Sequence, residues 1–335
     1  MFRLMAALLI ALAVSLLSGP QIIKLLRRLK VGKKIYELGP KHQEKEGTPL
    51  MGGIMIVLGV VIAVIICHIG LPVDIWNFSI GLTVVSLLSM AVGLTDDLIQ
   101  VIKKQHDGLT PMQKIIGQVA LSAVFAVYCY FNPDIGSVIW IPLANVQLDL
   151  GIFYIPLVML LVIFMVNSSN LQDGLDGLEG THTSVAAVGL ACMALVMAQK
   201  TTDAQLNGQY EQAAVFALAL AGGAMGYLRY NRYPAKVFMG DCGSMFIGGA
   251  VVGIACVLRQ PLMVLIVCFT MVMSSGSVMI QRVYFKLTHG KRIFKMSPIH
   301  HHFELCGYKE TQIVSMYAII TGVLSILAVL SLYGM

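Results

Sequence analysis

The chain has 335 residues, of which 57% are hydrophobic and only 12% are charged, and its mean hydropathy is +0.81. Soluble domains carry about 25% charged residues. This shortage of charge excludes an ordinary soluble enzyme, a disordered chain and a nucleic-acid-binding domain. Length alone would suggest about two soluble domains. The composition instead predicts one integral-membrane domain over residues 1–335, whose apolar exterior is covered by lipid.

Ten apolar segments have the length of membrane-spanning helices, since about 20 helical residues cross a bilayer core of about 30 Å. The first is too long for a signal peptide and is followed by many basic residues, so we expect a retained helix. The ninth exceeds the membrane core and is expected to tilt or kink. The pattern predicts an all-α polytopic membrane protein with about ten transmembrane helices. The segments are 1–23, 51–69, 78–99, 114–131, 152–168, 183–199, 212–229, 244–258, 262–286 and 312–333.

Basic residues fall almost entirely in one set of loops. If ten helices alternate in direction, all but three of the 23 lysines and arginines lie on one side, the exceptions being Arg3, Lys200 and Arg259. The positive-inside rule places that side in the cytoplasm and both termini outside. The same loops hold most acidic residues, most histidines and the glycine-rich motifs, so we expect a cytoplasmic-face active site. Among the outer loops, 132–151 could form a small hairpin.

Two motifs place aspartates at the cytoplasmic ends of helices. Asp96 and Asp97 end the third segment, where they repel each other at the unfavourable pole of the helix dipole. Because neighbours on a helix point about 100° apart, one can face a cavity while the other meets a lysine or a metal. Asp241, in NRYPAKVFMGDCGS (231–244), precedes the eighth segment and is a candidate magnesium ligand. Helix capping by Asp241 or Ser244 is the structural alternative.

Three further motifs combine polar groups with glycines or histidines. GTPLMGG (47–53) offers backbone N–H groups to an anion, and NSSNLQDGLDGLEG (167–180) repeats amides and carboxylates at a spacing of three. KMSPIHHHFELCGYKETQ (295–312) holds three consecutive histidines, which can donate to phosphate or exchange protons. For GTPLMGG, the alternative is a turn with helix-packing glycines. For 167–180 it is an ordinary polar turn, and for 295–312 it is a structural zinc site.

Carboxylates for a divalent metal, cations for phosphate and glycine turns together suit phosphoryl transfer, where positioning and charge neutralisation dominate. There is no P-loop, no dinucleotide-binding fingerprint and no Ser-His-Asp or Cys-His signature. A site at the cytoplasmic edge of a helical bundle could join a water-soluble nucleotide donor to a lipid acceptor. Two alternatives of other classes are a transporter, whose site would normally lie near the bilayer midplane, and a lipid scaffold without catalysis.

The motifs GTPLMGG, GLTDD, NSSNLQDGLDGLEG, YNRYPAKVFMGDCGS and PIHHHFE follow the order and spacing of the bacterial phospho-N-acetylmuramoyl-pentapeptide transferases, which the chain resembles over nearly its whole length. The HHH run distinguishes that family from relatives that transfer N-acetylglucosamine phosphate, the nearest rival. The resemblance implies a multi-pass enzyme of the bacterial cytoplasmic membrane that requires Mg²⁺. It implies transfer of phospho-MurNAc-pentapeptide from UDP-MurNAc-pentapeptide to undecaprenyl phosphate, giving lipid I and UMP. Membrane lipid is an expected partner, nucleic acid is not, and a homodimer is left open.

The resemblance also implies roles for single residues. Asp241 matches the principal Mg²⁺ ligand, and Asp96 and Asp97 match catalytic carboxylates, one of which would deprotonate or orient the lipid phosphate. His300, counted with the catalytic residues, and His301 match groups that bind the pyrophosphate or an intermediate. Residues that match contacts to the uridine and sugar, or polar groups near them, are Asn170, Asp173, Asp176, Phe238, Asn231 and Gln281. Residues that match essential cytoplasmic polar groups are Lys45, Thr48, Lys104 and Lys114. Leu50, Gln100 and Gln172 depart from the commoner Thr, Lys and Thr.

Overall fold

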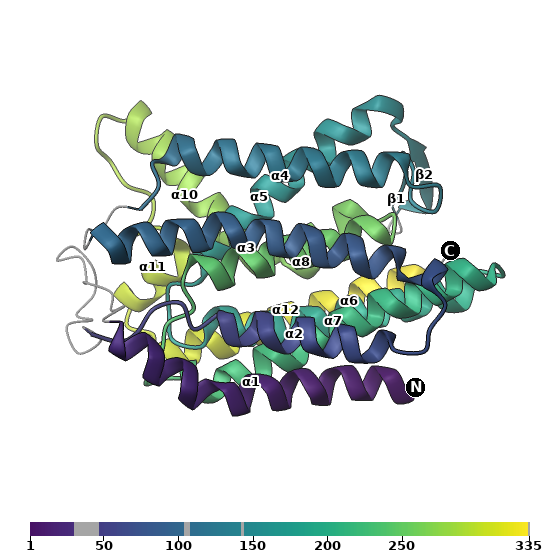
Figure 1. Ribbon diagram of the computed structural model, residues 1–335. Coiled ribbons are helices and arrows are strands. Elements are labelled where there is room, and N and C mark those ends of the chain that lie inside the picture. Colours follow the sequence, from purple (N-terminus) through teal and green to yellow (C-terminus); the bar gives the residue numbers. More distant parts are fainter. Residues whose placement is uncertain (30–46, 104–107, 142–143, 334–335) are drawn as a thin grey trace.

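In the computed structural model, the chain is built almost entirely of α-helices that run roughly along one direction (Figure 1). The structure describes residues 1–29, 47–103, 108–141 and 144–333. The helices are α1 (Phe2–Arg28), α2 (Ile54–His68), α3 (Asn77–Lys103), α4 (Pro111–Phe131), α5 (Tyr154–Gln172), α6 (Leu178–Lys200), α7 (Ala204–Asn231), α8 (Asp241–Val257), α9 (Val264–Val267), α10 (Phe269–Leu287), α11 (Ile299–Leu305) and α12 (Glu310–Tyr333). Short 3₁₀ turns lie at Val73–Trp76, Gly151–Phe153 and Pro261–Met263.

The helices confirm an all-α membrane protein. Within the described residues, seven helical segments are long and apolar enough to cross a bilayer, namely α1, α3 with its preceding turn, α4, α5 with its preceding turn, α6, α7 and α12. The run from Pro261 to Leu287 gives an eighth candidate, bent by 85° between α9 and α10, so the ninth predicted segment is indeed kinked. The apolar helices α2 and α8 are shorter, with 15 and 17 residues. All ten predicted segments fall on helices, while seven or eight meet the length expected of a span.

Helix α8 lies at the centre of the packing. Every residue of α8 after Asp241 is buried, which is the pattern of a helix surrounded by protein. It packs against α3 and α5 in particular. A Cβ atom at Gly93 of α3 would lie 2.2 Å from the backbone oxygen of Asp241, so only glycine permits this approach. The close packing of α3 on α8 therefore fixes the start of α8 beside the end of α3.

The chain termini and the end of α3 lie at opposite ends of the molecule. Both termini lie at one end, together with strands β1 (Val138–Ile141) and β2 (Val146–Asp149), whereas α3 ends at the opposite end (Figure 1). The strands pair antiparallel, with Val138 opposite Asp149, so the predicted small hairpin within 132–151 is confirmed. A hydrogen bond from the Trp140 N–H to the Arg259 carbonyl, 2.8 Å long, ties this hairpin to the end of α8.

The sequence-based boundaries were too narrow at three polar motifs. Helix α3 continues past Asp97 to Lys103. Most of 167–180 is helical, because α5 runs to Gln172 and α6 begins at Leu178, and the 295–312 motif contains α11. Hydropathy measures only the apolar length of a helix. The helix itself continues as long as its backbone and polar side chains find hydrogen-bond partners.

Candidate active site

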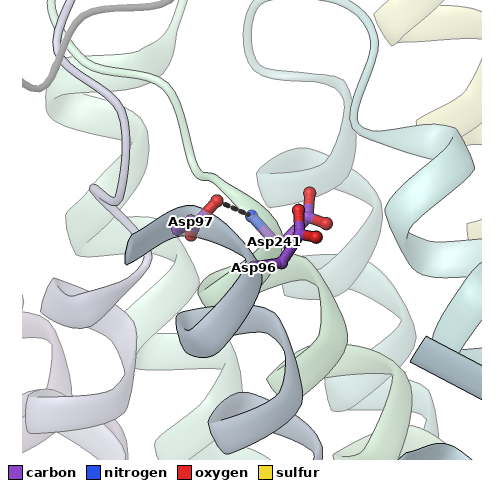
Figure 2. A group of neighbouring side chains, drawn as sticks. All are labelled: Asp96, Asp97 and Asp241. Atoms are coloured by element: carbon purple, nitrogen blue, oxygen red, sulfur yellow. Dashed lines mark hydrogen bonds between the residues drawn. The ribbon is translucent and has the colours of Figure 1, made fainter. Parts of the chain in front are cut away.

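The site is built around three aspartates that meet where α3 passes the start of α8. Ligand oxygens of Asp96, Asp97 and Asp241 all lie within 4.8 Å of one another. Asp96 and Asp97 are fully buried, and the Asp241 side chain is 21% exposed. In Figure 2, Asp96 lies beside Asp241, while Asp97 is turned toward the backbone nitrogen of Asp241. Two of the predicted motifs are thus brought into one cluster.

Asp97 caps helix α8 from a neighbouring helix. Its Oδ1 accepts the N–H of Asp241 at 3.1 Å, and its Oδ2 accepts the N–H of Cys242 at 3.0 Å. No side chain of the α8 N-terminus itself caps that helix, so the structural alternative, capping by Asp241 or Ser244, is wrong. A carboxylate at this pole is favoured by the helix dipole and satisfies two N–H groups that lack partners inside the helix.

Lys114 supplies the cation of the cluster. Its Nζ lies 2.7 Å from Asp241 Oδ2 and 3.0 Å from Asp96 Oδ2. Lys114 is brought there by α4, which begins at Pro111 with a capping box formed by Thr110 and Gln113. The prediction that one aspartate of the pair meets a lysine is confirmed for Asp96. The other aspartate, Asp97, faces the buried start of α8 and not a cavity.

The remaining contacts of Asp96 and Asp241 orient their carboxylates. Asp96 accepts hydrogen bonds from Gln100 Nε2 at 2.7 Å and from the Leu109 N–H at 2.6 Å. Asn170, near the end of α5, donates from Nδ2 to Asp241 Oδ1 at 2.7 Å and to Ser244 Oγ at 3.0 Å. Asn170, expected near the uridine and sugar, therefore lies directly against the expected metal ligand.

The cluster suits a divalent cation. All six carboxylate oxygens accept hydrogen bonds, yet an ionised carboxylate has about four acceptor positions, so capacity for a metal remains. Mg²⁺ binds through one or two carboxylates and keeps several waters. Partly exposed Asp241 is the member that solvent and a ligand can reach. Asp96 and Asp241, with Asp97 behind them, would hold Mg²⁺.

The GTPLMGG and VFMGD motifs lie against each other at the rim of the cluster. The Phe238 N–H donates to the Pro49 carbonyl, and the Gly52 N–H donates to the Phe238 carbonyl, both at 2.8 Å. Gly240 has a φ of +77°, and a Cβ there would lie 2.8 Å from Asp97 Oδ2. Thr48 and Phe238 are half-buried in these paired segments. The motifs thus shape the backbone next to Asp97 and Asp241.

Asn231 and Asp176 join the two loops that precede α6 and α8. Asn231 Oδ1 accepts the Gly177 N–H at 3.0 Å, and its Nδ2 donates to the Val237 carbonyl at 2.9 Å. Asp176 Oδ2 accepts the Ala235 N–H at 2.9 Å. Asp173 is half-buried in the residue that follows α5. Both Asn231 and Asp176 therefore make their contacts within the protein, between loops beside the site.

The histidine motif reaches the same region from α11. His300 is fully buried, and neither ring nitrogen has a hydrogen-bond partner among the described residues. A Cβ at Gly174 would lie 2.2 Å from His300 Nε2, so the ring packs on the turn between α5 and α6. Burial, together with neighbouring His301, holds the pKa of His300 well below its usual value. His301 contacts Glu304 through Nδ1 at 2.6 Å.

A basic cavity of about 540 Å³ lies between the end of α10 and α11. Gln281 supports its wall, since its Oε1 accepts the N–H groups of Ile293 at 3.1 Å and Phe294 at 3.0 Å. Four of its lining residues are cations. The cavity is lined by Gln281, Arg282, Phe285, Lys286, Arg292, Lys295, Met296, Ser297 and Leu305.

Sequence reasoning missed several supporting groups and named two that cannot be placed. Lys45 and Lys104 lie outside the described residues. Ser169, Glu179 and the Gln100 contact were not expected in the site. One signal in the sequence could have indicated Ser169 and Glu179. Polar residues continue the helical spacing of α5 past its apolar part, and they also begin α6.

Fold and site define the class as a helical membrane protein with buried carboxylates at one end that suit a divalent metal. A family model described as "Glycosyl transferase family 4" matches residues 79–259. Curated relatives called phospho-N-acetylmuramoyl-pentapeptide-transferase come from Clostridium kluyveri (40% identical, covering 99% of this chain and 100% of the relative), Clostridium novyi strain NT (41%, 98% and 97%) and Clostridium perfringens strain 13 (40%, 98% and 99%). The chain therefore belongs to glycosyl transferase family 4 and, within it, to the phospho-N-acetylmuramoyl-pentapeptide transferases.

Proposed function

We propose that this chain transfers phospho-MurNAc-pentapeptide from UDP-MurNAc-pentapeptide to undecaprenyl phosphate, producing lipid I and UMP. A phosphate oxygen of the lipid attacks the phosphorus that carries the sugar. The bond from that phosphorus to the bridging oxygen of UMP breaks, and the electron pair leaves with UMP. The observation that carries the proposal is the cluster of Asp96, Asp97 and Asp241, with Lys114 paired to Asp96 and Asp241, at one end of the helical bundle.

The chain's own groups meet the main demand of this reaction, which is to bring two anionic substrates together. Mg²⁺ bound at the cluster would neutralise charge on the phosphate oxygens. Lys114 holds Asp96 and Asp241 in place and carries positive charge at their side. Asn170 fixes the orientation of the Asp241 carboxylate. His300, whose ring nitrogens have no hydrogen-bond partner in the part of the chain that the structure describes, is a neutral group that can donate to or accept from a substrate phosphate or sugar.

Direct attack by the lipid phosphate is favoured over a covalent phospho-enzyme. Asp97 is fully buried, and both of its oxygens accept N–H groups of α8. Asp96 is fully buried as well, and both of its oxygens have donors. A nucleophile must be able to approach the phosphorus in line, and burial together with these hydrogen bonds leaves neither carboxylate open to such an approach in this arrangement. We therefore assign Asp97 to positioning α8 and expect no stoichiometric burst of UMP in the absence of lipid acceptor.

The lipid acceptor is proposed to lie along α10. The 85° bend between α9 and α10 sets α10 apart from the preceding turn, and side chains on its outer face are exposed, among them Met279, Val283 and Phe285. The basic cavity at the end of this helix would attract an anionic headgroup. A photo-crosslinkable polyprenyl phosphate should label residues within 262–286. Labelling confined to other helices would contradict this placement.

The distribution of the loop charges supports a site on the cytoplasmic side. Basic residues at the ends of α1, α3, α7 and α10 lie at the end of the molecule that holds the aspartates. We propose a multi-pass protein of the bacterial cytoplasmic membrane with both termini outside, since positive charge marks the cytoplasmic side.

Release of UMP by the purified protein tests the proposed function. UMP should form from UDP-MurNAc-pentapeptide only when both Mg²⁺ and undecaprenyl phosphate are present, and chelation of the metal should abolish it. UDP-GlcNAc in place of UDP-MurNAc-pentapeptide should give little UMP. Efficient turnover of UDP-GlcNAc instead would identify the chain as the N-acetylglucosamine phosphate enzyme, and release without lipid acceptor would contradict the transfer.

A further inference from the structure

A second acidic group lies behind the aspartate cluster, on the first turn of α6. Glu179 is fully buried, and no lysine or arginine of the described residues forms an ion pair with it. Its neighbours are uncharged donors: Ser169 Oγ lies 2.7 Å and Thr183 Oγ1 lies 3.5 Å from Oε1, and Gln172 Nε2 lies 3.0 Å from Oε2. A buried ionised carboxylate without a cation is costly, so the protonation of Glu179 needs a separate argument.

The hydrogens between these oxygens can be counted. Ser169 Oγ is 2.7 Å from Glu179 Oε1 and 2.6 Å from the backbone oxygen of Ser244. Two O···O contacts this short each need a hydrogen between the atoms. The hydroxyl of Ser169 has one hydrogen, and the Ser244 carbonyl has none to give. The second hydrogen must come from Glu179, which then donates to Ser169, while Ser169 donates to Ser244.

The same chain of contacts leads to the metal-binding carboxylate. Ser244 is held through its carbonyl by Ser169, and its Oγ accepts a hydrogen bond from Asn170 at 3.0 Å. Asn170 uses the same Nδ2 group to donate to Asp241 Oδ1 at 2.7 Å. Glu179 on α6 is therefore linked to Asp241 on α8 through Ser169 and Asn170 of α5 and Ser244 of α8.

We propose that Glu179 is a neutral carboxylic acid that acts as a positioning residue, holding Asn170 and Asp241 in the orientation that binds the divalent metal. This inference rests on the proposed function for its catalytic consequence, though not for its structural one. The neutral acid presents one donor, to Ser169, and one acceptor, to Gln172. The pairing also gives Gln172 a role, since its amide fills the second side of the Glu179 carboxyl group.

Replacement by glutamine separates the neutral acid from a carboxylate. In Glu179→Gln, the side-chain NH₂ can donate to Ser169 and the carbonyl can accept from Gln172, so the neutral arrangement is preserved. An ionised Glu179 would instead accept from both residues, and glutamine could not replace it. We expect Glu179→Gln to bind Mg²⁺ within about threefold of the unaltered protein, and Glu179→Ala and Ser169→Ala to bind it about tenfold more weakly, as outer-shell changes do.

Binding of Mg²⁺ alone can be measured by titration calorimetry on the purified protein, and the transfer reaction then gives the KM for Mg²⁺ and kcat. The matched control is Glu211→Gln, at an exposed position on α7. Equal weakening of Mg²⁺ binding by Glu179→Gln and Glu179→Ala would overturn the neutral acid, and unchanged binding in Glu179→Ala would overturn the positioning role.

Infrared difference spectroscopy gives a readout that folding alone does not move. At neutral pH, the spectrum of the unaltered protein minus that of Glu179→Gln should contain a carboxylic acid C=O band that shifts in D₂O. Loss of a carboxylate band in its place would contradict the proposal, even if Glu179→Ala fails to fold. Should no UMP form in the transfer assay, the proposed function would fall, whereas the infrared band and Mg²⁺ binding would still decide the state and role of Glu179.

Discussion

At the residue scale, the charge balance of the aspartate cluster explains why a divalent cation suits it. When ionised, the three carboxylates carry three negative charges against the single ammonium of Lys114, which contacts Asp96 and Asp241, so two negative charges lack a cation among the described residues. Buried charge that lacks compensation is costly, and a bound metal is often the largest local charge in such a site. Lys114 therefore limits the repulsion among the aspartates, and Mg²⁺ would complete the balance.

Replacing Lys114 with methionine keeps an unbranched side chain only one atom shorter and removes this charge. Loss of one partner from a buried ion pair costs about 3–5 kcal/mol. Because the Lys114 side chain is 26% exposed, we expect a stability loss in the lower part of that range. Loss of this positive charge from the site should also lower kcat/KM by about 100-fold. Steady-state UMP release measures it. The control is Lys103→Met at the exposed end of α3, and equal activities in the two variants would show that Lys114 has no part in the site.

His300 gives the protein a predictable pH dependence of stability. Since burial and His301 hold the pKa of His300 well below 6.5, the unfolded chain binds a proton at this position more readily than the folded protein. The contribution is fully present above about pH 6.5 and is lost as the pH falls toward the lowered pKa of the folded state.

Thermal unfolding in detergent between about pH 7.5 and 5.5 should reveal this contribution, which is at most about 1.4 kcal/mol per pH unit for one group. The unfolding midpoint of His300→Gln should fall less across that range than that of the unaltered protein. His289→Gln, at an exposed position, should behave like the unaltered protein. A steeper pH dependence in His300→Gln would mean that His300 is charged in the folded state.

Motifs identified most of the residues that gather here, although not their partners. Asp96, Asp97 and Asp241 stand out in an apolar sequence because a charge at a membrane edge is rare. Spacing along the chain could not show that Lys114 contacts Asp241, since 127 positions separate them. Nor could it show that the Asn231 carboxamide is used within the protein, because this depends on how two loops are packed.

At the element scale, helix α8 depends on another helix for its cap. In Asp97→Asn, the new side chain has only one acceptor oxygen. Its NH₂ group would face the second backbone N–H of α8, which then has no acceptor. Loss of a helix cap costs about 1–2 kcal/mol. We expect the thermal midpoint to fall by about 2–4 °C, with a loss of turnover, because Asp241 begins the same helix.

The thermal midpoint distinguishes this cap from a direct catalytic role. Asp74→Asn, at an exposed position before α3, should leave both midpoint and turnover unchanged. If Asp97→Asn abolished turnover at an unchanged midpoint, Asp97 would act on the substrate, and its assignment to positioning α8 would be wrong.

Hydropathy predicted the existence of the helices well and their ends poorly. An apolar run reports where a helix contacts lipid or the core, so all ten segments were found. It is silent on polar residues that extend a helix, such as Asn170 and Gln172 at the end of α5. The expected kink in the ninth segment followed from its excess length, whereas the 85° angle depends on packing that no single segment encodes.

At the scale of the whole molecule, the fold separates the termini from the site. Both termini lie at the end opposite the aspartates, as expected for an even number of alternating spans (Figure 1). Central α8 is shielded from lipid by other helices and starts with Asp241. A buried helix can therefore present a metal-binding carboxylate at one end of the bundle without placing it in lipid.

Chemical labelling of single cysteines tests which end faces the cytoplasm. Cys306, after α11 at the site end, is exposed, and Phe2 at the opposite end is 86% exposed. With both termini outside, a membrane-impermeant maleimide should label Phe2→Cys on intact spheroplasts and should label Cys306 only on inverted vesicles. The background variant carries Cys306→Ser and Cys192→Ser, which remove the two exposed native thiols. Restoring Cys306 or adding Phe2→Cys then gives one reporter for each end. Labelling of Cys306 on spheroplasts would reverse the orientation. The aspartate cluster would then lie outside the cell, away from the proposed cytoplasmic nucleotide substrate.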